Sequence, residues 1–408
     1  MSMSATTTMP LIPIARRAET LQVSEIVRIS ERARGLAAQG ENVISFGTGE
    51  PDFPTPPHVM AAAALAMHQG KTTYPPTAGI PELRAAVCNG HNALGGAPVV
   101  PEQVLISNGA KQVLSNAFLA TLNEGDEVIL PAPFWTSYLD MINVVGGRAV
   151  VVACGMSTDF KITPAQLREA ITDKTRWLML NSPSNPCGAM YSAAELSALA
   201  DVLRDHTGVA VIADEIYQHI AYKDFTTFSS VAPDLADRTL TVNGVSKAYA
   251  MTGWRIGWGI GPLPLIKTMT AIQGQATSGA CSISQAAAVA ALNGPQDLLA
   301  ERLNSFKERR DLVVNALNAT GLLTCPMPDG AFYVFPDCRK TFGKKTPKGA
   351  VIEDDAGFCA YLLEAEGVAV VPGRAFGLPG HFRFSYAYSP QSLQEGCRRI
   401  SRVVAALV

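Results

Sequence analysis

Residues 209–213, with the sequence VAVIA, restrict the fold of this chain more than any other segment. Every side chain in this run is apolar, which is typical of a strand that is buried on both faces. Helical patterns separate the run from other short strand patterns, as in sheets that are covered by helices. We therefore expect an α/β fold with a largely parallel sheet. Its other predicted strands lie at 104–107, 126–130, 149–152, 176–180 and 239–242.

An acidic pair ends this run, because Asp214 and Glu215 follow it directly and Tyr217 lies two positions further on. Active sites gather at such strand ends. A carboxylate at the end of a buried strand is unfavourable unless a cation pairs with it, so we expect a cationic partner for Asp214. The alternative is an aspartate that caps the next helix.

The stretch 243–261, NGVSKAYAMTGWRIGWGIG, places Ser246 and Lys247 just after a predicted strand. Its second half, 253–261, also alternates as a strand does, with Arg255 on the same face as two glycines. Glycine in a strand often marks close approach by another group, so we interpret this face as room for a flat, anionic ligand. The alternative is a solvated lysine and a strand packed tightly on a helix.

The chemistry of these residues favours one cofactor. A lysine enclosed among cations loses its proton readily, and its neutral amine can form a Schiff base with an aldehyde. Pyridoxal 5′-phosphate would offer its aldehyde to Lys247 and its phosphate to Ser246 and Arg255. Asp214 would hold the ring nitrogen protonated, and Tyr217 would hydrogen-bond the phenolic oxygen.

Other segments carry weaker candidates. Residues 109–111 open a predicted helix, where free backbone N–H groups bind phosphate. Trp135 or Tyr138 either stacks on an aromatic ring or fills the core. Asn185 lies in a turn after a predicted strand, and Gly49 allows close backbone approach in a loop rich in glycine and proline.

The pattern changes at about residue 298, where a long charged helix precedes short strands and a further helix. We expect an N-terminal arm and a joining helix over 1–46, a large cofactor-binding domain over 47–297 and a smaller α+β domain over 298–408.

The smaller domain carries one candidate site residue and one unexplained loop. In the strand predicted at 381–386, Arg383 is either a surface charge or a bidentate clamp for a substrate carboxylate, provided that this domain closes over the cofactor. The basic loop at 340–348 is most simply a solvated insertion.

Composition excludes several classes of protein. Hydrophobic residues make up 48% and charged residues 17%, as in ordinary soluble globular proteins. A net charge of -2 gives no sign of a nucleic acid or a membrane as partner. The eight cysteines form no CxxC pair, which favours free thiols over disulfides or a metal site. With no secretory signal or membrane-spanning run, we expect a cytoplasmic protein.

Taken together, the motifs resemble those of the fold type I pyridoxal-phosphate aminotransferases of class I and II, above all the prokaryotic aspartate aminotransferase branch. The resemblance extends from about residue 20 to the end, and several independent motifs at matching separations make it specific. It implies a mostly parallel seven-stranded sheet between helices, plus the smaller domain. The motifs are GEPDFPTP, YPPTAGIPELR, SNPCGAMY, ADEIY, VSKAYAMTGWRIGW, GAFYVFPD and VAVVPG.

The resemblance also implies a role for each matching residue. Lys247 would bind the cofactor and, once freed, move the proton of the substrate α-carbon, while Asp214 pairs with the ring nitrogen. Tyr217 and Asn185 would contact the ring oxygen, Asn185 would also contact the substrate, and Arg383 would bind the substrate α-carboxylate. The other matches are Trp135 on the ring and the substrate, Gly49 on the substrate, and Gly109, Ala110, Lys111, Ser246 and Arg255 beside the phosphate.

Two further implications concern assembly and substrate. In the family, the tyrosine matching Tyr74 reaches the phosphate of the neighbouring subunit, which implies a homodimer with shared sites. Residues matching Lys111 and Ser24 help to bind acidic substrates, which favours aspartate or glutamate, with 2-oxoglutarate or oxaloacetate, in a ping-pong reaction. Aromatic, prephenate or broad specificity is the alternative.

Three rival functions remain open from the sequence. A lyase, decarboxylase or synthase of the same fold would share Lys247 and Asp214. A ligand sensor fused to a DNA-binding domain lacks a basic recognition helix here. A Schiff-base aldolase on a (β/α)₈ barrel disagrees with the two-domain pattern.

Overall fold

A seven-stranded sheet forms the centre of the computed structural model, which describes residues 12–19, 21 and 24–408. The strand order is β2-β8-β7-β6-β5-β3-β4, and only β8 runs antiparallel to its neighbours. The expected α/β class and largely parallel sheet are therefore confirmed. The strands are β2 (Val104–Ser107), β3 (Glu127–Ala132), β4 (Arg148–Ala153), β5 (Thr175–Asn181), β6 (Ala210–Asp214), β7 (Thr239–Gly244) and β8 (Gly257–Ile260).

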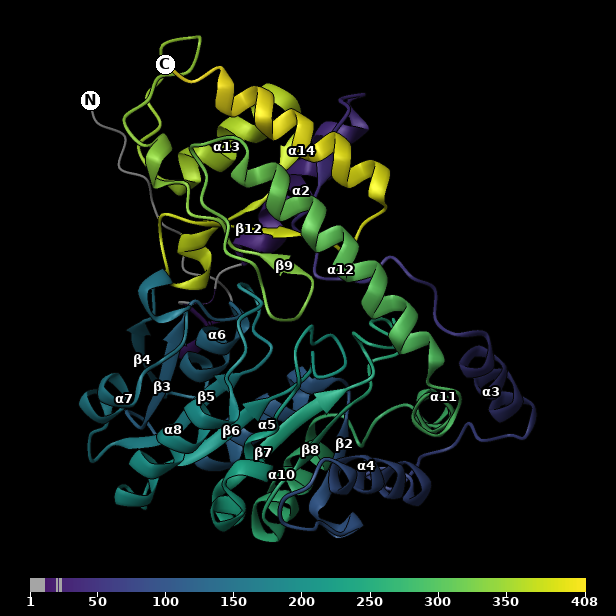
Figure 1. Cartoon of the computed structure of the whole chain (residues 1–408). Coiled ribbons are helices and arrows are strands. Elements are labelled where there is room, and N and C mark those ends of the chain that lie inside the picture. Colours follow the sequence, from purple (N-terminus) through teal and green to yellow (C-terminus); the bar gives the residue numbers. More distant parts are fainter. Residues whose placement is uncertain (1–11, 20, 22–23) are drawn as a thin grey trace.

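Both faces of this sheet are covered by helices, as Figure 1 shows. Strand β6 has hydrophobic neighbours on both faces, which explains the unbroken apolar sequence of residues 209–213. Ile212 packs into a core with α5 and α10, whereas Val211 and Ala213 pack into a second core with α8. The helices of this part are α4 (Pro81–Ala93), α5 (Ala110–Thr121), α6 (Ser137–Val144), α7 (Pro164–Ala170), α8 (Ala193–Asp205), α9 (Phe228–Val231), α10 (Leu263–Ala276) and α11 (Ser282–Asn293). A further helix, α3 (Pro57–His68), packs on α11 and projects to the side of the sheet (Figure 1).

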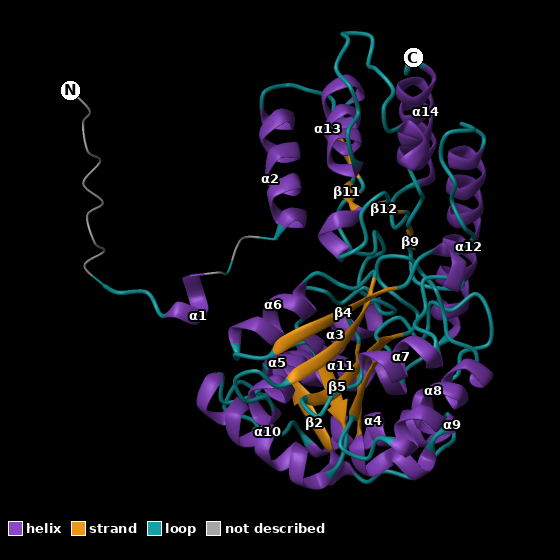
Figure 2. Ribbon diagram, turned by 90° about the vertical axis from the view of Figure 1, so that its left-hand side faces the viewer, coloured by secondary structure: helices purple, strands orange, loops and turns teal. Residues whose placement is uncertain are grey.

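A second group of elements lies above the carboxyl ends of these strands (Figures 1 and 2). It has its own hydrophobic core, a three-stranded sheet of order β11-β12-β9 and a parallel pair, β1 with β10. Its helices are α2 (Glu25–Ala38), α12 (Asp297–Asn318), α13 (Asp355–Glu366) and α14 (Pro390–Ala405). Its strands are β1 (Ile44–Ser45), β9 (Tyr333–Val334), β10 (Val368–Ala369), β11 (Val371–Pro372) and β12 (Phe382–Ser385).

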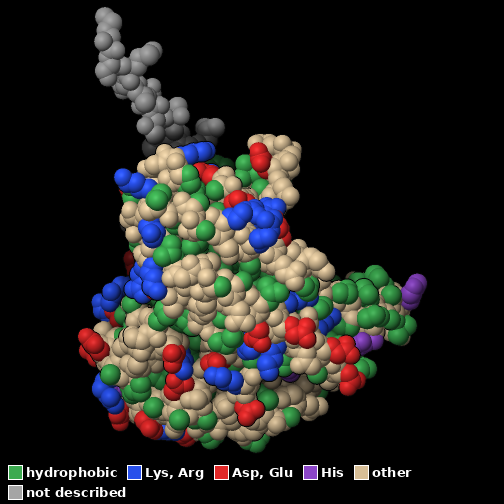
Figure 3. Space-filling view, turned by 45° about the horizontal axis from the view of Figure 1, so that its top comes forward, with side chains coloured by type: hydrophobic (Ala, Val, Ile, Leu, Met, Phe, Trp, Pro, Cys, Tyr) green, Lys and Arg blue, Asp and Glu red, His purple; other side chains and the backbone are tan. Residues whose placement is uncertain are grey.

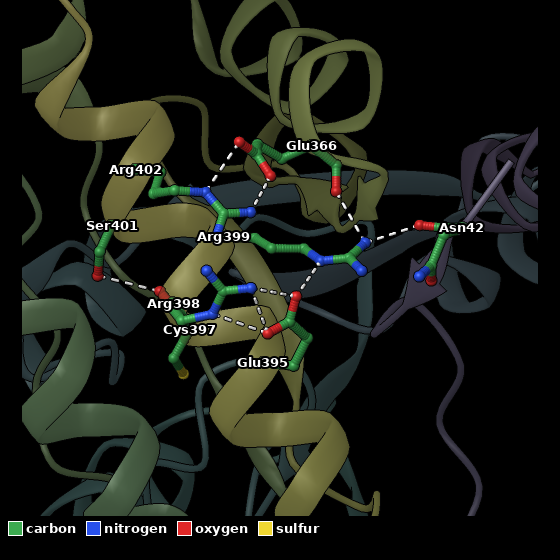
Figure 4. A network of polar contacts seen from close by, with 8 residues as sticks. All are labelled: Asn42, Glu366, Glu395, Cys397, Arg398, Arg399, Ser401 and Arg402. Atoms are coloured by element: carbon green, nitrogen blue, oxygen red, sulfur yellow. Dashed lines mark hydrogen bonds and ion pairs between the residues drawn. The ribbon is translucent and has the colours of Figure 1, made fainter.

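Polar contacts tie the N-terminal segment to this second group (Figure 4). Arg399 of α14 donates to the backbone carbonyls of Asn42 and Glu366 at 2.7 and 3.0 Å, and to the carboxylate of Glu395 at 2.7 Å. One buried arginine of α14 therefore joins the entry to β1 with the C-terminal end of α13. Of the predicted N-terminal arm, residues 1–11, 20, 22 and 23 lie outside the described part of the chain.

The interpretation of the glycine-lined face of the stretch 253–261 as room for a flat, anionic ligand is wrong. The strand begins only at Gly257, after Arg255 at a φ of +56°. A Cβ atom on Gly257 would collide with the backbone nitrogen of Ala110, and one on Gly259 would lie 2.6 Å from Val113. The glycines make room for α5, not for a flat ligand, because helix and strand pack at contact distance. In the described part of the chain, no helix combines the length and apolar character that crossing a membrane requires.

Candidate active site

A cavity of about 310 Å³ opens where β5, β6 and β7 end and the second group of elements begins. Its size suits a small-molecule site. It brings together residues from segments far apart in the chain. The lining residues are Ile26, Gly49, Ala110, Lys111, Trp135, Tyr138, Asn181, Asn185, Asp214, Ile216, Tyr217, Ser246, Lys247, Thr252, Arg255, Tyr333 and Arg383.

Lys247 follows β7, and its Nζ donates to the carbonyl oxygen of Gly49 at 2.8 Å. Burial, together with the nearby cations Arg383 and Arg255, lowers the pKa of Lys247 to about 8, against the opposing effect of Glu50 and Asp214. A substantial fraction of the amine is therefore neutral at a pH near 7. A neutral lysine beside a cavity is a nucleophile and a base.

Asp214 ends β6 with only 3% of its surface exposed. Its carboxylate accepts a hydrogen bond from the Tyr138 hydroxyl at 2.6 Å and one from the Ile216 backbone nitrogen at 3.2 Å. Burial raises the pKa of Asp214 to about 6, although the Tyr138 hydrogen bond opposes this. Among the described residues no side chain forms an ion pair with Asp214, and Lys247 is the cation that acts on its pKa, so the close cationic partner predicted for this carboxylate is not among the described contacts.

The N-terminus of α5 and Arg255 form an anion-binding corner. The Arg255 guanidinium donates to the carbonyl oxygens of Thr252 and Asn108 at 2.9 and 3.3 Å. Gly109, at a φ of +81°, lies against this guanidinium, and a Cβ atom there would collide with it. The free N–H groups of the first helical turn and the guanidinium together suit a phosphate.

Trp135 and Lys111 line the same side of the cavity. The Lys111 ammonium lies 4.8 Å from the centre of the Trp135 ring, and the ring meets that of Tyr138 edge to face. Burial lowers the pKa of Lys111, as does the charge of Arg255, while Asp140 raises it. Tyr138, considered as a possible stacking residue, instead donates its hydroxyl proton to Asp214.

Arg383 lies on β12 with 2% of its surface exposed. It donates to the Asn185 side-chain oxygen at 2.9 Å and to the carbonyl oxygen of Gly47, while its Nε has no partner among the described residues. The guanidinium lies over the rings of Tyr333 and Phe376, at 4.7 and 5.0 Å. A buried arginine without a carboxylate partner suits an anionic ligand.

The comparisons with known proteins agree with this geometry. Residues 41–400 match the family model for aminotransferases of class I and II. The chain belongs to the class I and II aminotransferase family.

The relatives of this aminotransferase are similar to it along nearly their whole length. It is 52% identical to the aspartate/prephenate aminotransferase of Cereibacter sphaeroides, over 94% of this chain and 96% of that protein. It is also 52% identical to an aspartate aminotransferase of Rhizobium meliloti, over 95% of each chain.

Solved structures support the same family and its fold type I architecture. The aspartate aminotransferase from Rhizobium meliloti aligns with a TM-score of 0.95 and 50% identity, over 97% of this chain and 100% of that one. The enzyme from Thermus thermophilus with maleate aligns with a TM-score of 0.89 and 40% identity, over 96% and 100%.

Three predicted site residues of this aminotransferase are not among the lining residues of the cavity: Gly109, Tyr74 and Ser24. Gly109 directly precedes the lining residue Ala110. Tyr74 is 90% exposed. Ser24 caps α2, and its hydroxyl accepts from the backbone nitrogen of Val27 at 3.4 Å, two residues before the lining residue Ile26. Their roles therefore stay predictions.

Sequence reasoning did not select several lining residues, of which Asn181, Ile26 and Tyr333 are examples. Asn181 ends β5, where its side chain donates to the carbonyl oxygen of Asp214 at 2.9 Å, so its place at a strand end was a usable signal. Tyr333 lies within a family motif, GAFYVFPD, but only the fold brings it to the cavity.

Proposed function

We propose that this aminotransferase moves the amino group of aspartate or glutamate to a 2-oxo acid, either 2-oxoglutarate or oxaloacetate, in a ping-pong reaction. The observation that carries the proposal is the presence of two cations, Arg383 and Lys111, in the same cavity as Lys247. A dicarboxylic substrate can pair one carboxylate with each cation while its α-carbon faces the lysine. The names of the relatives support this substrate class.

The cofactor proposed is pyridoxal 5′-phosphate, and the residues fit it. Asp214 is a buried carboxylate that forms no ion pair with a described side chain, which suits pairing with a protonated ring nitrogen. Ala110 at the start of α5, Ser246 and Arg255 would hold the phosphate. Trp135 would cover the ring, and Tyr217 and Asn185 would donate to its phenolic oxygen. When bound, the cofactor supplies an electron-withdrawing ring that acidifies the substrate α-C–H bond.

The protein residues then divide the remaining tasks. Arg383 binds and orients the α-carboxylate, with Asn185 beside it. Lys247, whose pKa of about 8 leaves part of the amine neutral, moves the proton of the α-carbon. Lys111 pairs with the second carboxylate of the substrate. Ile26, which also lines the cavity, helps to exclude water from it.

Prephenate is the second candidate acceptor, because relatives at 52% identity are named aspartate/prephenate aminotransferases. Prephenate is also a 2-oxo acid with a second carboxylate. The same pair of cations would therefore bind it.

A half-reaction tests these proposals. The enzyme loaded with pyridoxal phosphate is mixed with one amino acid and no 2-oxo acid, and the products are counted. We expect one equivalent of 2-oxo acid per site, formed fastest from aspartate and glutamate. Continuous release of pyruvate or ammonia would indicate a lyase, and faster reaction with aromatic or basic donors would contradict the acidic substrate. Adding prephenate or 2-oxoglutarate afterwards identifies the acceptor.

The assembly proposed is a homodimer in which Tyr74 completes the phosphate site of the partner subunit. Its support is the 90% exposure of Tyr74, next to a helix, α3, that projects with exposed apolar side chains (Figure 3). Those side chains are Met60, Leu65 and Met67.

We also propose the division into parts at 1–46, 47–297 and 298–408. The proposed location is the cytoplasm, in keeping with the eight free cysteines.

A further inference from the structure

We propose that Tyr333 is a positioning residue of this site: its hydroxyl directs the proton of Tyr217 into the cavity, and its ring supports the guanidinium of Arg383. The inference rests on the proposed function, because Tyr217 is taken to donate to the cofactor. Tyr333 lies on β9, opposite Ser385 of β12, so it is a diagonal neighbour of Arg383 on the same face of the small sheet.

The two hydroxyl groups form an isolated pair. The Tyr217 and Tyr333 oxygens lie 2.8 Å apart, both side chains are buried, and neither hydroxyl has another hydrogen-bond partner among the described residues. Burial raises the pKa of both phenols, so each keeps its proton. The pair therefore has two protons and uses only one for the bond between them.

The direction of that bond decides what Tyr217 can do. A phenol has one proton to donate. If Tyr217 donates to Tyr333, it has none left for a ligand. If Tyr333 donates to Tyr217, the proton of Tyr217 points elsewhere, and the donated bond polarises it. Gly49 lies directly against the Tyr333 hydroxyl, because a Cβ atom on Gly49 would collide with it. When an acceptor lies in front of Tyr217, Tyr333 must therefore act as the donor.

The ring of Tyr333 has a separate task. It lies 4.7 Å from the guanidinium carbon of Arg383, and the ring of Phe376 lies at 5.0 Å. The Nε atom of Arg383 lacks a partner among the described residues, so aromatic faces replace part of its missing hydration. The charged and titratable groups that influence the two phenols are Arg383, Asp214 and Tyr388.

Spectroscopic titration of the loaded enzyme tests the hydroxyl. A donor to the phenolic oxygen stabilises the deprotonated form of the bound cofactor, so loss of the donor raises the pKa of its visible absorption band. We expect Tyr217→Phe to raise that pKa by about one unit or more, and Tyr333→Phe by a few tenths of a unit. Tyr386→Phe is the matched control. It removes a hydroxyl from another tyrosine pair, in which buried Tyr386 lies 3.0 Å from partly buried Tyr222. Both hydroxyls donate to the carbonyl oxygen of Ala331, which does not line the cavity. Its titration should match that of the wild type.

Kinetics test the ring. Tyr333→Leu should raise the KM of the amino donor about fivefold more than Tyr333→Phe, since only leucine removes the aromatic face under Arg383. Equal KM values would overturn the role of the ring, and a Tyr333→Phe titration equal to that of Tyr386→Phe would overturn the role of the hydroxyl. If the wild type takes up no cofactor at Lys247, measured as chain mass after borohydride reduction, the proposed function fails first. A wild type that binds the cofactor, with no shift in Tyr217→Phe, contradicts the proposed contact of Tyr217 with the phenolic oxygen and overturns this inference, but it leaves the proposed transamination standing.

Discussion

Burial shifts two ionisable residues of the cavity in opposite directions. The pKa of Lys247 falls to about 8, and that of Asp214 rises to about 6, because the charged form of each loses its water. Both shifts favour a ligand that reacts with a neutral amine and brings a cation to the carboxylate. At the scale of single residues, burial therefore makes the charged forms of Lys247 and Asp214 unfavourable in the absence of a ligand.

The lowered pKa of Lys247 predicts how cofactor attachment depends on pH. Only the neutral amine reacts, and its fraction rises as the pH rises through about 8, not through the ordinary 10.5. We expect the attachment rate to increase about fivefold between pH 7 and pH 8 and to level off above that. Stopped-flow absorbance measures it, with N-acetyl-lysine amide as a control for ionisation of the cofactor itself. A midpoint above pH 10 would show that Lys247 is solvated.

The raised pKa of Asp214 predicts that the cofactor-free protein gains stability when this charge is removed. The folded state holds the proton up to about pH 6 and the unfolded state only to about 3.8, so stability falls as the pH rises between these values. Asp214→Asn should therefore raise the free energy of unfolding at pH 7 by about 1 to 2 kcal/mol. This figure already includes the cost of the hydrogen-bond donor that loses its acceptor. Cofactor affinity should fall strongly.

Thermal melts and cofactor titration measure the two effects of this substitution. Glu215→Gln is the matched control, since burial raises the pKa of Glu215 to about 7 and its carboxylate bonds Thr227 and Phe228. It should change stability but leave cofactor affinity intact. Unchanged cofactor affinity in Asp214→Asn would contradict the role of that carboxylate.

The packing of β8 on α5 sets the position of the anion-binding corner. Gly257 touches the backbone at Gly109 and Ala110, where α5 begins, and Arg255 precedes the strand by two residues. Strand and helix are therefore one unit with respect to the phosphate site. Gly257 matters because its missing side chain lets the backbone of β8 contact the backbone of α5. Its effect therefore depends on both elements together.

Gly257→Ala should displace the start of α5. Overpacking of this kind costs about 1 to 3 kcal/mol, and the displaced N–H groups should weaken phosphate binding as well. Gly253→Ala is the control, because nothing lies within 4 Å of a Cβ atom there. Melting temperature and the affinity for inorganic phosphate are the measurements. Equal values for the two variants would show that α5 tolerates the added methyl group.

At the scale of the whole molecule, the cavity lies between the large sheet and the second group of elements, and one predicted contributor does not reach it. Tyr74 is exposed beside the projecting helix α3, whose outer side chains are apolar. Both features are unfavourable in an isolated subunit, and the partner subunit of the proposed dimer would cover them.

Met67→Glu should therefore dissociate the proposed dimer and lower activity at least tenfold, since a buried unpaired charge opposes association. Met327→Glu is the control, because Met327 is exposed to a similar extent, 48% against 52%, but lies away from α3. Sedimentation measures the assembly. A monomeric wild type, or a dimer that persists in Met67→Glu, would contradict this interface.

The sequence was sufficient for locating the strands of the large sheet along the chain and for naming the residues at strand ends. Asp214, Ser246 and Lys247 follow short runs whose apolar character requires burial, so local pattern and chemistry agree. The glycines of β8 were misjudged, because spacing shows which face lacks side chains but not what packs against it.

By itself, then, the sequence determined the α/β fold and the reactive side chains at the ends of β6 and β7, because strand burial and residue type are local properties. Only the tertiary structure decided which distant groups share the cavity. Arg383 meets Asn185 across 198 positions, and Tyr333 meets Tyr217 across 116. It also decided the pKa values of Lys247 and Asp214, because desolvation depends on all the elements that close around a charge.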